Sequence, residues 1–95
     1  SPAELQTLIN AGLEEAHRVL RPGGILLVKC MDYVSSGKLW LGTHYTMSHA
    51  LRLGFEAVDR LEHIGSPRPQ PPRPRQVHAR RNLSTLFVLR RRIGL

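Results

Sequence analysis

The unbroken apolar run Ile25–Val28 constrains the fold of this chain more than any other feature of its sequence. It follows directly on the helix-breaking residues Pro22–Gly24, and polar residues return at Lys29. A short run of branched apolar residues between such signals is typical of a strand that is buried on both faces, as in parallel α/β sheets. The sequence therefore predicts an α/β fold. Because ligands of α/β sheets bind beyond the carboxyl ends of strands, the first candidate site residues are Lys29, Cys30, Asp32 and Tyr33.

Helical patterns lie on both sides of this strand. In residues 1–21 an apolar side chain recurs every three or four positions, as in an amphipathic helix. Ser1 followed by Pro2 is a typical helix start. We expect a second helix over residues 44–53, capped by Gly54. Between the first strand and this helix, the polar stretch 34–43, with Lys38 and Trp40, is predicted to be a loop.

The second half of the chain holds one clear strand and one ambiguous segment. Leu83–Leu89 is the clear strand. Phe55–Ile64 has an apolar residue at every third position, which suits a helix, yet it directly follows a glycine cap, and the pattern leaves helix and strand open. The last strand has no helix before it, so it should pair antiparallel to its neighbours.

Length and cysteine content narrow the class of protein. Ninety-five residues allow one small domain, residues 1–95. The single cysteine, Cys30, excludes an internal disulfide framework and a multi-cysteine zinc site, and no metal site is expected. It also favours a reducing, cytoplasmic setting. The sequence has no apolar run of roughly 18 residues, so no membrane contact is expected.

The basic residues are concentrated in the last third of the chain. The formal net charge is +7, but residues 1–65 hold six basic and seven acidic side chains, whereas residues 66–95 hold eight arginines and no acid. Such asymmetry suggests an acidic partner, most commonly nucleic acid. The alternative is a basic tail that only aids solubility.

A proline- and arginine-rich loop is expected over residues 66–82. Five prolines between residues 66 and 74 exclude a helix or a central strand there. Arginine side chains held on an extended backbone suit phosphate groups. Arg68, Pro71 and Pro74 also have the spacing of polyproline ligands, so a partner-binding scaffold remains an alternative.

The first predicted helix ends in Leu20–Gly24 (sequence LRPGG), and Ile25–Lys29 follows it. This order resembles the middle of a class I, Rossmann-like S-adenosylmethionine-dependent methyltransferase. Phe55–Ile64 resembles the sixth strand of that fold, and Leu83–Arg92 resembles its seventh. The resemblance implies that Phe55–Ile64 is a strand. It also implies a small three-stranded mixed sheet with two helices, in which the last strand is central and antiparallel.

A narrower resemblance is to phage and bacterial site-specific DNA methyltransferases. It rests on Val28–Asp32, on Ser36–Lys38 and on the stretch from Arg68–Gln70 through Gln76–Asn82 before the last strand. The family's Gly-rich cofactor turn and its Pro-Pro-aromatic motif are absent from these 95 residues. The resemblance thus implies the C-terminal half of such a protein, or a middle piece of a permuted one. S-adenosylmethionine would bind the complete fold, and this chain alone would bind no cofactor and carry no catalytic residue.

We therefore interpret the chain as the C-terminal part of a DNA adenine or cytosine amino methyltransferase-like protein, which contributes strands and a basic loop that faces DNA. The alternative is a non-catalytic nucleic-acid-binding or partner-binding module derived from such an enzyme. The open edge of Ile25–Val28 should pair with a companion chain, a second copy or a missing segment. The candidate nucleic-acid-binding residues are Lys29, Lys38, Arg68, Arg73, Arg75, His78, Arg80, Arg81 and Asn82.

Overall fold

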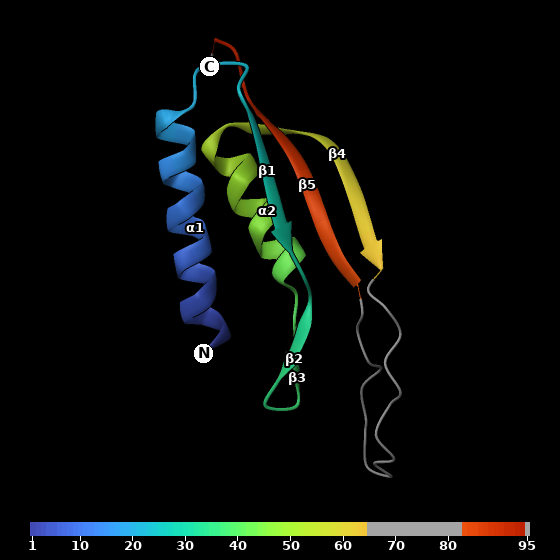
Figure 1. Ribbon diagram of the computed structural model, residues 1–95. Coiled ribbons are helices and arrows are strands. Elements are labelled where there is room, and N and C mark those ends of the chain that lie inside the picture. Colours follow the sequence, from blue (N-terminus) through green and yellow to red (C-terminus); the bar gives the residue numbers. More distant parts are fainter. Residues whose placement is uncertain (65–82, 95) are drawn as a thin grey trace.

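The computed structural model describes residues 1–64 and 83–94. Two helices, α1 (Pro2–Val19) and α2 (Gly42–Leu53), pack side by side on one face of a three-stranded sheet. The sheet contains β1 (Ile25–Cys30), β4 (Phe55–Ile64) and β5 (Leu83–Arg91), and a separate hairpin contains β2 (Tyr33–Ser35) and β3 (Lys38–Trp40). Figure 1 shows this two-layer arrangement.

The strand order is β1-β5-β4, so the last strand lies in the centre and pairs antiparallel with both neighbours. β1 and β4 consequently run in the same direction. The predicted α/β fold class and the central, antiparallel last strand are confirmed. Phe55–Ile64 is a strand, as the resemblance implied and against its helical spacing.

The core lies between the helices and the inner face of the sheet. Leu13 of α1, Ala50 of α2 and the strand residues Phe55, Phe87 and Leu89 are buried there. Gly54 ends α2 with a φ of 109°, a left-handed conformation that glycine adopts at little cost, and the chain then enters β4 directly. This predicted cap is confirmed, and it explains how a helix and a strand follow each other without a loop.

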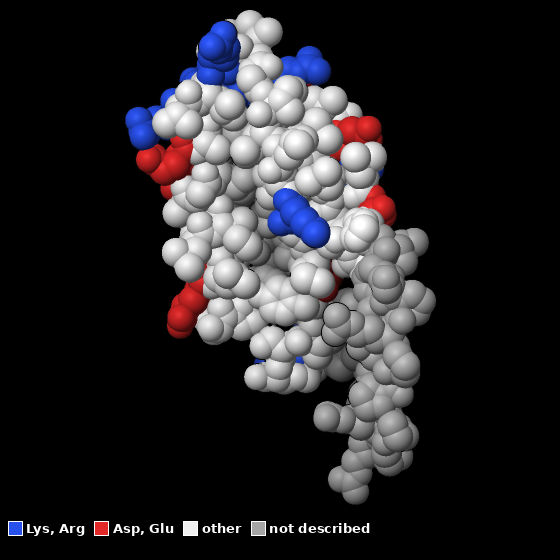
Figure 2. Space-filling view, viewed as in Figure 1, with Lys and Arg blue, Asp and Glu red and all other residues white. Residues whose placement is uncertain are grey.

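The opposite face of the sheet, which we call the open sheet face, is covered by no element of the described part of the chain. Ile25 and Leu27 of β1 are 48% and 60% exposed, and Leu61 of β4 is 49% exposed. Figure 2 shows this side as a broad uncharged surface with one cation near its middle and most charges at its rim. The prediction that β1 is buried on both faces is therefore wrong for this chain, because both helices lie on the same side.

The two edge strands of the sheet differ in how they are protected. β4 has a bulge at Val58, between Ala57 and Asp59, and it carries several charged side chains. β1 pairs with β5 without any register irregularity, and its one charged side chain is Lys29. Bulges and charges are features that keep an edge from pairing with another strand, so β4 is a protected edge and β1 is not.

The predicted loop over residues 34–43 is a hairpin instead. Ser36 and Gly37 connect β2 and β3 with φ angles of 51° and 76°. Two successive positive φ values are the mark of the type I′ turn, which matches the twist of a two-residue hairpin. The polarity of the stretch concealed this, since each strand has only three residues.

Candidate nucleic-acid interface

One end of the molecule collects the elements that bear the candidate residues. The carboxyl ends of β1 and β4, the amino end of β5 and the amino ends of both helices lie there, together with the β2–β3 hairpin (Figure 1). Residues 65–82, which join β4 to β5, are attached at this end. Seven predicted residues lie outside the described residues: Arg68, Arg73, Arg75, His78, Arg80, Arg81 and Asn82.

The two lysines among the candidate residues lie on different parts of this end. Lys29 is exposed on β1 and lies opposite Leu86 of β5, on the open sheet face. Lys38 is exposed on β3, opposite Ser35. Lys29 is therefore part of a largely apolar surface, whereas Lys38 extends from a small projecting hairpin.

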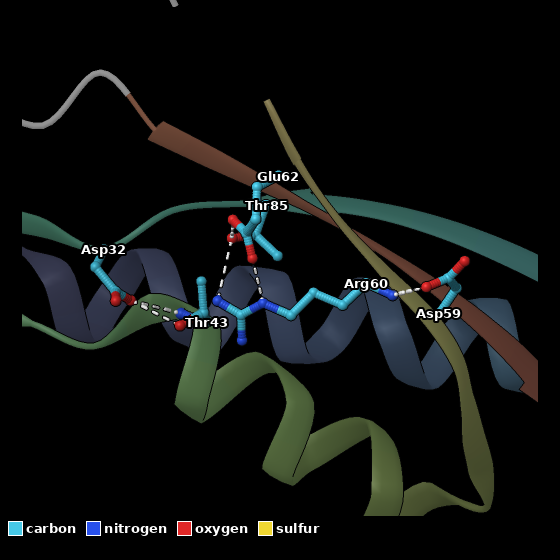
Figure 3. Close-up of polar contacts among 6 residues, drawn as sticks. All are labelled: Asp32, Thr43, Asp59, Arg60, Glu62 and Thr85. Carbon is cyan, nitrogen blue, oxygen red and sulfur yellow. Dashed lines mark hydrogen bonds and ion pairs between the residues drawn. The ribbon is translucent and has the colours of Figure 1, made fainter. Parts of the chain in front are cut away.

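Asp32 links the end of β1 to the start of α2. Its Oδ1 atom accepts hydrogen bonds from the Thr43 backbone N–H, at 3.0 Å, and from the Thr43 hydroxyl, at 2.9 Å (Figure 3). The N-cap residue Leu41 makes no side-chain cap, so a carboxylate eleven residues upstream of Thr43 takes this role. Gly42 permits the close approach, because a Cβ there would lie 2.3 Å from the Met31 carbonyl oxygen.

A second polar cluster crosses the sheet near the same end. Arg60 of β4 forms an ion pair with Glu62, and the Thr85 hydroxyl donates to Glu62 at 2.7 Å (Figure 3). The hydrogen bonds from Arg60 and then from Thr85 hold the pKa of the Glu62 carboxyl below its usual value. The Arg60 guanidinium also lies 5.4 Å from the centroid of the Phe87 ring. Sequence reasoning missed this cluster because Thr85 is 23 residues from Glu62 and 25 from Arg60 in the chain.

Three aromatic rings meet where the hairpin contacts α2. The Trp40 and Tyr45 ring centroids are 4.8 Å apart, and the His44 and Tyr45 centroids are 5.5 Å apart. The buried Gln6 amide of α1 accepts a hydrogen bond from the Trp40 indole at 3.4 Å. The sequence offered only a weak signal for this group, namely Trp40 and Lys38 in one polar stretch.

The histidines of the described residues and Cys30 lie apart from one another or pair with other groups. No group of three or more His, Cys, Asp or Glu side chains in residues 1–64 and 83–94 is placed to hold a metal ion. His49 instead lies 3.0 Å from Glu14 across the two helices. None of the helices described is both long and apolar enough to cross a membrane.

Comparison with known proteins identifies the fold. No protein-family model and no curated protein matches the sequence. A solved structure from Thermus thermophilus, provisionally assigned as a DNA modification methylase and complexed with S-adenosyl-L-methionine, matches over 97% of this chain with a TM-score of 0.73 and 17% identity. A selenomethionine derivative of that protein matches over the same share, with a TM-score of 0.71 and 17% identity.

The match covers 39% of the Thermus thermophilus chain, and 38% in its selenomethionine derivative. This chain therefore has a methyltransferase-like fold and spans about two-fifths of the length of the structures it resembles. The predicted partial methyltransferase fold is confirmed at the level of architecture.

Proposed function

We propose that this chain is the C-terminal part of an S-adenosylmethionine-dependent DNA methyltransferase, in which it contributes sheet strands and a basic DNA-facing loop. The observation that carries the proposal is the match of nearly the whole chain to a protein that is bound to S-adenosyl-L-methionine. An adenine or cytosine amino group would accept the methyl group, and the complete protein would be of the phage or bacterial type.

The unprotected edge and the open sheet face support a larger assembly. Among the described residues, β1 has a neighbouring strand on one side only, and its other side lies next to the apolar side chains of Ile25 and Leu27. Such an exposed apolar edge favours pairing with another strand. A companion chain, a second copy or a missing segment of the same protein would cover it, and the similar structures are long enough to include such a segment.

The chain itself is poorly suited to hold the cofactor. β1 is followed by Met31 and Asp32 and not by a Gly-rich turn, and the Asp32 carboxylate is already engaged with the start of α2. In this proposal the cofactor-binding and catalytic residues come from outside the 95 residues. The chain supplies positioning of the substrate and positive charge, with no catalytic residue of its own.

DNA contact is assigned to the cationic residues at the end of the molecule where β1 and β4 finish. Lys38 projects there from the hairpin, and residues 65–82 are attached to the same end by β4 and β5. The proposed contacts to phosphate and bases come from Lys29, Lys38, Arg68, Arg73, Arg75, His78, Arg80, Arg81 and Asn82.

A non-catalytic nucleic-acid-binding module is the second candidate. The absence of the Gly-rich turn and the Pro-Pro-aromatic motif from these 95 residues favours it. A direct test extends the chain with the coding sequence on either side and titrates S-adenosylmethionine by calorimetry and a duplex DNA by fluorescence anisotropy. The proposal expects the extended protein to bind both ligands and the 95-residue chain to bind DNA alone.

The affinity for DNA should fall steeply as the salt concentration rises. Replacing Arg80 and Arg81 by alanine should make the plot of log affinity against log salt concentration less steep, because fewer counterions are then released on binding. A matched control replaces Arg18 and Arg21, two arginines at the far end of α1 and just beyond it. DNA binding by the extended protein without cofactor binding would select the non-catalytic module. Binding of neither ligand would overturn both candidates.

A further inference from the structure

A groove between α1 and α2 has the properties of a small ligand site. Its volume is about 370 Å³, within the ~300–1,000 Å³ of typical small-molecule pockets. No residue of the three-stranded sheet lines it, so it is independent of both the open sheet face and the β1 edge. The lining residues that matter here are Asn10, Trp40, His44, Tyr45, Ser48 and Arg52.

An aromatic wall, formed by Trp40, His44 and Tyr45, makes one side of the groove. The Tyr45 ring packs against Trp40 with an interplanar angle of 48° and against His44 with an angle of 63°. Tyr45 remains 40% exposed in this arrangement. The wall therefore presents aromatic surface to solvent, although its rings already contact one another.

The buried amide of Gln6 holds the wall in place. Gln6 is 7% exposed, and its Nε2 atom donates to Asn10 Oδ1 and to Thr46 Oγ1, each at 3.1 Å. Its Oε1 atom accepts the hydrogen bond from the Trp40 indole. Trp40 is thus fixed by a satisfied polar network, and such pre-organisation reduces the entropy lost when a ligand binds.

Three other polar groups of the groove are available to a ligand. Within the described part of the chain, the Asn10 side-chain NH₂, the Ser48 hydroxyl and the Arg52 guanidinium make no hydrogen bond or ion pair. No acidic side chain lines the groove. Its chemistry is therefore a flat aromatic surface beside hydrogen-bonding groups and one unneutralised cation.

We propose that this groove binds a nucleobase together with its 5′-phosphate. The base stacks on the exposed part of the Tyr45 ring, Asn10 and Ser48 hydrogen-bond to the base edge, and Arg52 pairs with the phosphate. The inference rests on the proposed function in one respect only, namely that the nucleotide comes from an unpaired base in DNA. A free nucleotide has the same chemistry, and the experiment separates the two sources.

Trp40 is the only tryptophan of the chain, so its fluorescence reports on the groove directly. The experiment titrates the 95-residue chain with the four deoxynucleoside monophosphates, a six-residue single-stranded DNA and the corresponding duplex. We expect a saturable change in Trp40 emission with single-stranded DNA, at lower concentration than with the duplex. Saturation by monophosphates at equal or lower concentration would assign the site to free nucleotides. If none of these ligands causes a saturable change in Trp40 emission, the proposal is overturned.

Variants separate the groove from other basic surfaces. Tyr45→Leu and Arg52→Ala should each weaken binding about tenfold, as loss of one stacked base or one phosphate contact would. Tyr45→Phe keeps the ring and should retain the affinity, which also controls for disruption of the aromatic wall. His63→Ala, in β4, and Arg18→Ala, whose guanidinium pairs with Glu15, should have no effect.

Affinity unchanged in folded Tyr45→Leu and Arg52→Ala variants, with folding checked by circular dichroism, would overturn the proposal. That result would place DNA binding elsewhere on the chain and leave the proposed methyltransferase function intact. Conversely, groove binding without cofactor binding by the extended protein would support this inference while removing the catalytic assignment.

Discussion

At the scale of single residues, Cys30 shows how the two layers of the fold set the chemistry of a side chain. It lies on β1 and packs against the core under the helices. Burial, and then the negative charge of Asp32, raises the pKa of its thiol to about 11. A thiol with this pKa stays protonated near neutral pH, so Cys30 acts as a packing residue and not as a nucleophile.

This raised pKa predicts slow alkylation. At pH 8 the folded chain should react with iodoacetamide about a hundredfold more slowly than the chain in urea, because the thiolate is correspondingly scarcer. The rate should rise with pH until about pH 11. Mass spectrometry measures it at one site, since the chain has a single cysteine. Equal rates in the folded and unfolded states would contradict the buried position of Cys30.

At the scale of elements, α2 depends on a side chain outside its own sequence. The Asp32 carboxylate satisfies the Thr43 N–H in the first turn, and it sits where the positive end of the helix dipole favours an anion. The helix is only 12 residues long, so its first turn is a large part of it.

Asp32→Ala should therefore lower the free energy of unfolding by about 1 kcal/mol, the usual effect of removing an N-terminal cap. Urea denaturation followed by circular dichroism measures the change. Asp59→Ala is the matched control, because Asp59 is exposed and, within residues 1–64 and 83–94, accepts a hydrogen bond only from the adjacent Arg60 N–H. A similar effect of both substitutions would show that Asp32 does not act as a cap.

The elements also show where sequence reasoning succeeds and where it fails. α1, β1 and β5 have strong local signals, and each was predictable within a few residues. The segment β4 was ambiguous because Val58 is a bulged residue, which shifts the inward and outward alternation that normally identifies a strand. The hairpin was missed because a type I′ turn with serine at its first position is a weak signal.

At the scale of the whole molecule, the sequence predicted which strand ends bear the candidate residues but not the contacts made there. The change from Val28 to Lys29 placed the carboxyl end of β1 two residues too early, since the strand continues through Lys29 to Cys30. The hydrogen bonds between Asp32 and Thr43 and between Gln6 and Trp40 depend on how the elements pack. They correspond to no periodic pattern in the sequence. The aromatic groove was therefore beyond prediction from sequence alone.

The open sheet face predicts self-association of the isolated chain. Light scattering coupled to size-exclusion chromatography should give a mass above that of one chain at high concentration. Leu27→Lys should lower that mass, because it places a charge in the middle of the apolar face. Ile93→Lys is the control, since Ile93 is 75% exposed but follows β5 outside the sheet. A stable monomer of the unmodified chain at high concentration would contradict the prediction.

The irregular register around Val58 has a consequence for how far such association can go. When two copies join through β1, the enlarged sheet ends on both sides in a β4 strand, and each of these outer strands is kinked and charged. A third copy then finds no straight strand on which to add. Growth by this route terminates at a two-fold symmetric pair and never propagates into a fibre.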